Sequence, residues 1–201
     1  SLMTPFFSPG PSPYPVPDVF TAAVNPYNCR VAGEVSDGLM LHSLTSAEYV
    51  RQVVQPGLAK GAERAGREPG ATLVCGGGFI VTGPDRGSIR AAEAELRRRI
   101  AFYASTRTYS SVLECHGFAE IGQRLHQMSV RGEWAEMAEL VSDDMLNAFA
   151  VIGEYDEIGE KFVQRYGGLL DEVNFVMFTS SPPEEAQMRK IIRQIQEAPA
   201  N

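Results

Sequence analysis

The sequence lacks several features that would point directly to a class of protein. Its 201 residues include three cysteines, and 25 acidic side chains outnumber 18 basic ones, which gives a formal net charge of −7. Cys29, Cys75 and Cys115 form neither a CxxC pair nor a zinc-binding pattern, so we expect no metal site and a reducing, cytoplasmic setting. No apolar run approaches the ~18 residues of a membrane span, which argues against a membrane partner. Nucleic-acid binding requires clustered Lys and Arg, and the acidic balance argues against it.

Familiar catalytic motifs are also missing. The chain contains no GxSxG, no HExxH and no phosphate-binding GxxxxGK[ST] sequence. A run of three glycines, Gly76-Gly77-Gly78, lies inside an apparent strand rather than between a strand and a helix, so it is not a dinucleotide fingerprint. We interpret it as a kink or a close backbone approach, with ligand contact as the alternative. The sequence therefore identifies no catalytic residue.

The length of the chain and the distribution of its prolines indicate how the chain divides into an arm and a domain. Residues 4–17 hold six of the thirteen prolines, and we interpret residues 1–17 as an extended arm. The remainder, 18–201, is long enough for one domain with one sizeable core. A complete eight-stranded α/β barrel usually needs ~250 residues, so the length argues against one.

Hydrophobic periodicity predicts strands that alternate with helices. We predict four strands, at 19–24, 38–42, 72–81 and 173–178. The predicted helices cover 26–35, 46–66, 88–103 and 154–166, and a last one follows Pro182. A helical insertion around 105–147 interrupts the alternation with two helices. We interpret Trp134, on the second, as part of the core between these helices, with the wall of an apolar pocket as the alternative. The fold class is α/β, with about four parallel strands flanked by helices.

Two strand ends are the candidate functional positions. Ala23, Val24 and Asn25 form a turn at the carboxyl end of the first strand and open a helix, where exposed N–H groups suit a phosphate. His42 ends the second strand, Ser43 follows it, and both lie at the same edge. Each feature has an ordinary alternative: many strand–helix turns bind nothing, and a lone histidine is more often structural than catalytic. No role is assigned to His116 or His126.

The stretches 19–43, 100–117 and 149–158 together resemble the bacterial-luciferase-like monooxygenases. The family is a group of flavin- or coenzyme F-420-dependent TIM barrels, and the first strand here matches roughly the fifth of their eight. The resemblance implies a partial barrel, the C-terminal half of the fold. It also implies that Ala23, Val24 and Asn25 contact the phosphate of FMN or coenzyme F-420, with His42 and Ser43 towards the substrate. Asn25 replaces the usual glycine of this turn, and asparagine tolerates a positive φ.

The resemblance implies an oxidoreductase that acts on a small molecule by hydride transfer or monooxygenation and is incomplete as a single chain. The alternative is a non-catalytic relict or binding module that holds a flavin-like ligand or none. A half barrel leaves two strand edges unpaired and one apolar face uncovered. We therefore expect a homodimer or a complementary N-terminal half-barrel chain as partner.

Overall fold

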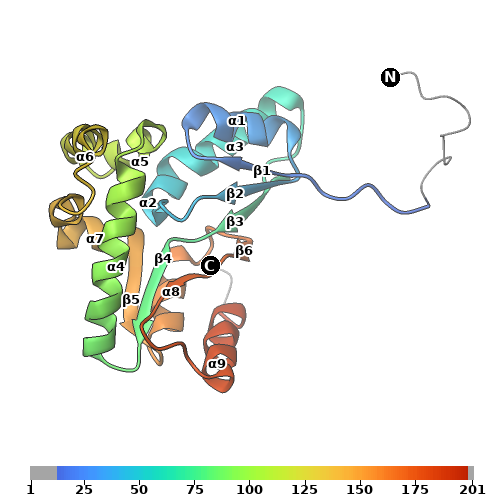
Figure 1. The fold of residues 1–201 in the computed structure, drawn as a ribbon. Coiled ribbons are helices and arrows are strands. Elements are labelled where there is room, and N and C mark those ends of the chain that lie inside the picture. The colour runs from blue at the N-terminus through green and yellow to red at the C-terminus, as the bar shows by residue number, and fades with distance from the viewer. Residues whose placement is uncertain (1–12, 199–201) are drawn as a thin grey trace, which may run out of the picture.

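The computed structural model describes residues 13–198, which form parallel sheets flanked by helices (Figure 1). The strands are β1 (Phe20–Ala23), β2 (Gly38–Leu41), β3 (Leu73–Gly76), β4 (Phe79–Gly83), β5 (Ala150–Glu154), β6 (Glu172–Val173) and β7 (Val176–Phe178). The α-helices are α1 (Pro26–Val35), α2 (Ala47–Tyr49), α3 (Gln55–Ala65), α4 (Arg86–Ala104), α5 (Ser110–Glu114), α6 (Ala119–Arg131), α7 (Asp143–Phe149), α8 (Ile158–Tyr166) and α9 (Glu185–Gln196). A π-helical turn, η2 (Val50–Val54), joins α2 to α3, and the 3₁₀ turns η3 (Arg107–Tyr109) and η4 (Met137–Leu140) flank α5 and α6.

The strands form two parallel sheets, in the orders β1-β2-β3-β6 and β5-β4-β7. Two of the predicted strands contribute to both sheets: 72–81 is divided into β3 and β4, and 173–178 into β6 and β7. Because β3 pairs with β6 and β4 pairs with β7, both divisions fall at the same level. The chain therefore passes from one sheet to the other twice, side by side.

The triple-glycine run makes the first of these passages possible. Gly77 has a φ of +137°, which side chains other than glycine rarely adopt. A Cβ at Gly78 would lie 2.3 Å from the hydroxyl of Tyr166, which is buried and donates a hydrogen bond to the carbonyl of Thr45. Burial raises the pKa of Tyr166 to about 12. The interpretation of the run as a kink and a close backbone approach is thus confirmed.

The two faces of the β1-β2-β3-β6 sheet differ. Helices α1 and α3 pack together over one face, where Leu39 and Val74 are buried (Figure 1). On the other face, Met40 is 45% exposed and Leu73 is 37% exposed. The register places Phe20 and Ala22 of β1 and Cys75 of β3 on this same second face. We call the face made by Phe20, Ala22, Met40, Leu73 and Cys75 the bare face.

The long helical segment after β2 changes its hydrogen-bond pattern in the middle. Ser46 caps its start by accepting a hydrogen bond from the backbone N–H of Tyr49. In η2 the backbone N–H of Gln55 donates to the carbonyl of Val50, five residues back. Pro56 follows and has no N–H to continue an α-helical ladder, which explains the wider turn at this point.

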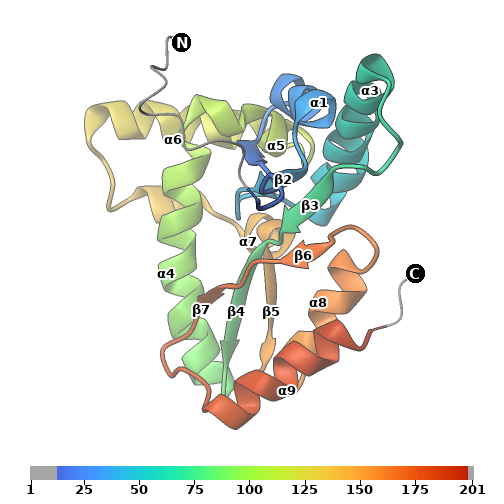
Figure 2. The same cartoon turned by 90° about the vertical axis from the view of Figure 1, so that its right-hand side faces the viewer.

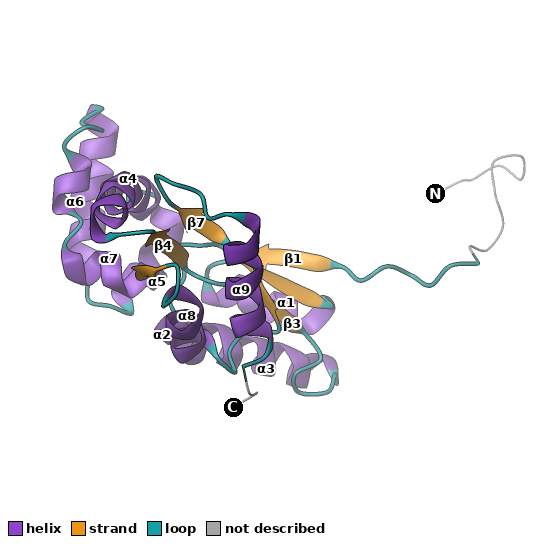
Figure 3. Cartoon of the chain, turned by 90° about the horizontal axis from the view of Figure 1, so that it is seen from below, coloured by secondary structure: helices purple, strands orange, loops and turns teal. Residues whose placement is uncertain are grey.

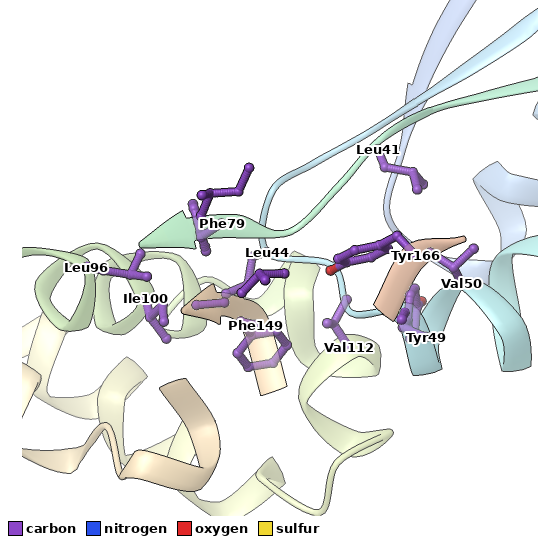
Figure 4. Close-up of a cluster of buried hydrophobic side chains, with 14 of the residues drawn as sticks. Leu41, Leu44, Tyr49, Val50, Phe79, Leu96, Ile100, Val112, Phe149 and Tyr166 are labelled. Atoms are coloured by element: carbon purple, nitrogen blue, oxygen red, sulfur yellow. The ribbon is translucent and has the colours of Figure 1, made fainter. Parts of the chain in front are cut away.

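The buried core joins both sheets. It runs from Leu96 and Ile100 of α4, past Phe149 and Leu44, to Tyr49 at the start of the π turn (Figure 4). All five β4 residues are buried, because α4 packs against the β5-β4-β7 sheet and helices α8 and α9 pack near it (Figure 2). This second sheet is consequently a covered layer, unlike the first.

Three details of the sequence prediction are wrong. Residues 150–154 form a strand, β5, and the helix expected from residue 154 begins at Ile158. The segment 109–147 contains α5, α6, η4 and the start of α7 instead of two helices. Trp134 lies in the turn after α6 and is 51% exposed, so it is not a core residue.

The chain approaches β1 as an exposed segment. Residues 13–19 contain no helix or strand and lead away from the body at the edge of the sheet (Figures 1 and 3). Residues 13–17 are the described part of the predicted arm, and residues 1–12 lie outside the described residues. The backbone N–H of Val19 donates to the carboxylate of Asp37 at 2.8 Å, which anchors the arm where the strand begins.

Candidate functional site

The structure brings the two candidate strand ends together. Ala23, the last residue of β1, pairs with Leu41, the last residue of β2. Val24 and His42 therefore leave the sheet at the same level on neighbouring strands, at its carboxyl edge. We call Ala23, Val24, Asn25, His42 and Ser43 the strand-end site.

Asn25 forms the start of α1. Its side chain Oδ1 accepts a hydrogen bond from the backbone N–H of Asn28 at 2.9 Å. Its φ of −80° and ψ of 157° are the ordinary extended values of an N-cap, so the turn does not require the positive φ that asparagine would tolerate. The side chain thus occupies one of the N–H groups that a phosphate could bind.

The first turn of α1 retains one open donor. Pro26 has no N–H, and the N–H of Cys29 donates to the carbonyl of Asn25 at 3.1 Å. Among the described residues, the N–H of Tyr27 has no such acceptor. Arg30 lies one turn further on, with its guanidinium 5.0 Å from the centre of the Tyr27 ring and its Nε 3.6 Å from the carboxylate of Glu34. A cation therefore lies close to the open N–H.

His42 is held as a neutral ring. The backbone N–H of Leu44 donates to its Nδ1 at 3.0 Å, so Nδ1 carries a lone pair and Nε2 carries the proton. Burial lowers the pKa of His42 below its ordinary value of 6.5. Its ring centre lies 4.4 Å from that of Tyr103 and 4.9 Å from that of Tyr109. His42 can donate a hydrogen bond through Nε2–H, and protonation of Nδ1 would break the contact with Leu44.

Tyr49 connects the strand-end site to the helical segment that follows α4. Its hydroxyl donates to the carbonyl of Val24 at 2.8 Å and lies 2.8 Å from the hydroxyl of Ser111 on α5. The side chain is buried, and burial raises the pKa of Tyr49, so the hydroxyl stays protonated as a donor. The position of the turn after β1 is therefore fixed from α2 and α5.

The other two histidines, His116 and His126, form hydrogen bonds with neighbouring residues of the fold. His116 Nε2 lies 2.7 Å from the hydroxyl of Ser46, and His126 Nδ1 donates to the carbonyl of Ser105 at 3.0 Å. These contacts join the segment from α5 to α6 to the start of α2 and to the end of α4. Ser43 differs from them: it is partly exposed, and its hydroxyl forms no hydrogen bond with another residue of the 13–198 range.

Sequence reasoning gave no site role to five residues around this site: Tyr27, Arg30, Tyr49, Tyr103 and Tyr109. The spacing of Tyr27 and Arg30 on a predicted helix could have indicated that their side chains meet. Tyr49 and Tyr103 reach the site from α2 and α4, and no local pattern predicts those contacts.

Cavities and charge clusters elsewhere do not compete for this role. A cavity of about 1030 Å³ between α3, α8 and α9 is lined by none of the strand-end residues. Residues 13–198 contain no group of three or more His, Cys, Asp or Glu side chains arranged to hold a metal ion. Within the same residues, no helix combines the length and apolar composition that a membrane-spanning segment needs.

Comparison with known proteins identifies the family. The sequence profile of the luciferase-like monooxygenases matches residues 1–172. The chain belongs to the luciferase-like monooxygenase family. The resemblance stated from the sequence is confirmed. An uncharacterised protein of Mycobacterium tuberculosis is 41% identical over 180 residues, which cover 90% of this chain and 53% of that relative. A methylenetetrahydromethanopterin reductase of Archaeoglobus fulgidus is 23% identical and is matched over 45% of its length, against 77% of this chain.

Solved structures of this luciferase-like family share the fold over half their length. The coenzyme F-420-dependent tetrahydromethanopterin reductase of Methanopyrus kandleri superposes with a TM-score of 0.68 at 22% identity, over 90% of this chain and 50% of that one. An F-420-dependent secondary alcohol dehydrogenase gives a TM-score of 0.56 at 19% identity, over 89% of this chain and 48% of the other. The prediction of an α/β half barrel is thus confirmed. The chain spans about half the length of the curated relatives it matches.

Proposed function

We propose that this chain is the C-terminal half of a luciferase-like oxidoreductase that uses coenzyme F-420 or FMN. The observation that carries the proposal is the strand-end site, where an open helix N-terminus and a neutral histidine lie on adjacent strands of a family sheet. A structurally similar tetrahydromethanopterin reductase and a structurally similar secondary alcohol dehydrogenase, both named as F-420-dependent, support the choice of coenzyme. The substrate would be a small molecule.

The residues of the strand-end site fit the phosphate-bearing end of such a coenzyme in part. The open N–H of Tyr27 is a donor of the kind that phosphate oxygens accept, and Ser43 offers a hydroxyl on the substrate side. Small residues at Ala22 and Ala23 let a ligand approach the backbone of β1 closely. Arg30 brings positive charge one helical turn away, although Glu34 balances it. The Asn25 side chain, by capping Asn28, leaves this turn with one open donor fewer.

The chemistry assigned to this chain is binding and orientation. When bound, the coenzyme supplies the ring that carries the hydride. His42 would donate from Nε2–H to a carbonyl or ring oxygen, and its neutral state is maintained by the Leu44 contact. Tyr103 and Tyr109 would exclude water from that hydrogen bond. Tyr49 would hold the turn that binds the phosphate.

The alternative is a binding module of the same fold without catalysis. The capped turn at Asn25 favours it, because the cap leaves fewer N–H donors for a phosphate, and so does the bare face, which the described chain leaves exposed. In either case we propose that a partner covers the bare face. A second copy of the chain would do so, and so would a complementary N-terminal half-barrel chain.

Titration of the purified chain with coenzyme F-420 and with FMN tests the proposal. We expect one of them to bind, with a change in absorbance or fluorescence. Turnover with a reduced substrate would support the enzyme, and binding without turnover would support the module. Absence of binding at millimolar coenzyme, both alone and with the N-terminal half of a relative added, would overturn the proposal.

The substitution Asn25→Asp tests the position of the phosphate. Asp caps a helix as well as Asn does, so the fold is retained, but its carboxylate repels a phosphate dianion by about 1 kcal/mol or more. We expect the coenzyme to bind about fivefold more weakly. Ser142→Asp is the matched control, because Ser142 caps α7 through the N–H of Met145 in the same way. Equal affinity in both variants would remove the turn after β1 from the site.

A further inference from the structure

A second cavity lies among the helices that follow β4, outside the strand-end site. It has a volume of about 280 Å³ and lies between the end of α4, η3, α5 and α6. These helices gather at one end of the molecule, away from α9 (Figures 1 and 2). None of the strand-end residues lines this cavity, which we call the insertion cavity.

Small residues keep the insertion cavity open. Gly122 of α6 faces Leu113 of α5, and a Cβ at Gly122 would lie 2.6 Å from the Leu113 Cδ1 atom. Ala104 and Ala119 also line the cavity. Because Leu113 and Ala104 are buried, the base of the cavity is apolar, whereas the exposed residues at its rim are polar. A space of this size is slightly smaller than drug-sized pockets and suits a ligand of amino-acid size.

Charges of both signs line the same cavity. Arg107 comes from η3 and Glu114 comes from α5. Neither forms an ion pair or a side-chain hydrogen bond with any residue of the described chain, and they do not pair with each other. A guanidinium binds a carboxylate through two parallel hydrogen bonds, and a carboxylate binds an ammonium group. His126, Gln123 and Gln127 add hydrogen-bonding groups around the two charges.

The overall charge of the molecule narrows the class of ligand. A net charge of −7 disfavours a free organic anion, whereas a molecule with one carboxylate and one ammonium group carries no net charge. We propose that the insertion cavity binds a small zwitterion of the α-amino acid class. Arg107 binds its carboxylate, Glu114 binds its ammonium group, and its side chain lies against Leu113 and Ala104.

The chemical class is tested by calorimetric titration of the full chain, without any flavin or deazaflavin, using three probes of matched shape. L-Leucine carries both charged groups, 4-methylpentanoate lacks the ammonium group, and 3-methylbutylamine lacks the carboxylate. We expect L-leucine, or another member of a set of apolar L-amino acids, to bind at least tenfold more tightly than its two matched analogues. Equal binding of an analogue, or no binding by any amino acid, would overturn the proposal.

Substitutions locate the ligand in the cavity. Arg107→Leu and Glu114→Gln should each weaken binding at least tenfold. Ser110→Trp should do the same by filling the cavity without removing either charge. The matched controls are Arg124→Leu and Glu120→Gln on α6, which are exposed and do not line the cavity. Unchanged affinity in the three cavity variants, or equal loss in the controls, would overturn the assignment. Because no coenzyme is present, the outcome is independent of the function proposed for the strand-end site.

Discussion

The two sheets of this chain differ in how far the molecule completes them. Every residue of β4 is buried, whereas β2 exposes Met40 on the bare face. Both sheets are parallel, and parallel sheets are normally covered on both faces. Within the described chain, the central strand of the β5-β4-β7 sheet meets this rule, whereas the β1-β2-β3-β6 sheet leaves Met40 and Leu73 exposed on one face. We therefore expect β4 and its neighbours to be stable within the chain, and the bare face to be the place where the proposed partner binds.

The largest effect should come from the covered sheet. Ile80→Ala in β4 removes a fully buried side chain, and we expect a loss of about 3 kcal/mol in the free energy of unfolding. Denaturant unfolding at fixed protein concentration measures it. The loss should be the same at low and high concentration, because no partner contributes to this layer. A loss below about 1 kcal/mol would show that the β5-β4-β7 sheet is not a packed core.

A negative charge placed on the bare face should weaken binding of the proposed partner chain. If a second copy or a complementary half covers this face, Met40→Asp buries an unpaired carboxylate there and weakens the complex by about 2 kcal/mol. Sedimentation velocity measures the shift to monomer, and the melting temperature should stop rising with protein concentration. Val35→Asp on α1 is the control, because Val35 is 68% exposed on the helical side of the sheet. A monomeric wild-type chain with a concentration-independent melt would contradict the homodimer.

A smaller effect should follow from removing the Tyr49 hydroxyl, which links the turn after β1 to α5. Tyr49→Phe removes hydrogen bonds to Val24 and Ser111 but retains the buried ring, so we expect a loss of about 1 kcal/mol in stability. If the turn after β1 binds coenzyme, its affinity should fall as well. Ser111→Ala is the informative comparison, since it retains the bond to Val24. Equal coenzyme affinity in wild type and Tyr49→Phe would show that the turn needs no such support.

The smallest effect concerns pH. The pKa of His42 is lowered in the folded chain, so the unfolded chain binds more protons below about pH 6.5. The contribution of His42 to stability is therefore complete above that pH and is lost as the pH falls towards the folded pKa. His42→Asn retains an acceptor for the Leu44 N–H but does not titrate. Thermal unfolding between pH 7 and pH 5 should show a shallower pH dependence in this variant, and an unchanged slope would contradict the assignment.

The sequence predicted the regular part of the first sheet well. Pro26 and a helix-length spacer predicted α1 at 26–35, and the β-rich run before it and the apolar run after it predicted β1 and β2 to within one residue at each end. It missed β5, because Ala150–Glu154 is short and directly follows α7, and residues 148–153 were assigned to no helix or strand. Trp134 was misplaced because an aromatic residue among methionines favours a core position, and only the tertiary structure exposes it.

The candidate site was predictable in position but not in detail. Strand ends can be located from the pattern, and parallel pairing then brings Val24 and His42 to one edge. The state of each group depends on contacts that the local sequence does not encode. The hydroxyl of Tyr49 comes from 25 residues away, and the tautomer of His42 depends on the backbone of Leu44. These contacts decide which donors remain for a ligand.

The direct continuation of β3 in the first sheet into β4 in the second also affects the order of folding. The first three strands lie within residues 20–76 and are joined by short helical crossovers, so their contacts are local in sequence. In the second sheet, Phe79 pairs with Ala150, and the whole helical segment lies between them. Contacts between distant parts of a chain form slowly, since a long loop must first be closed. We expect residues 20–76 to fold early and to present β4, through Gly77 and Gly78, as the edge on which the second sheet later assembles.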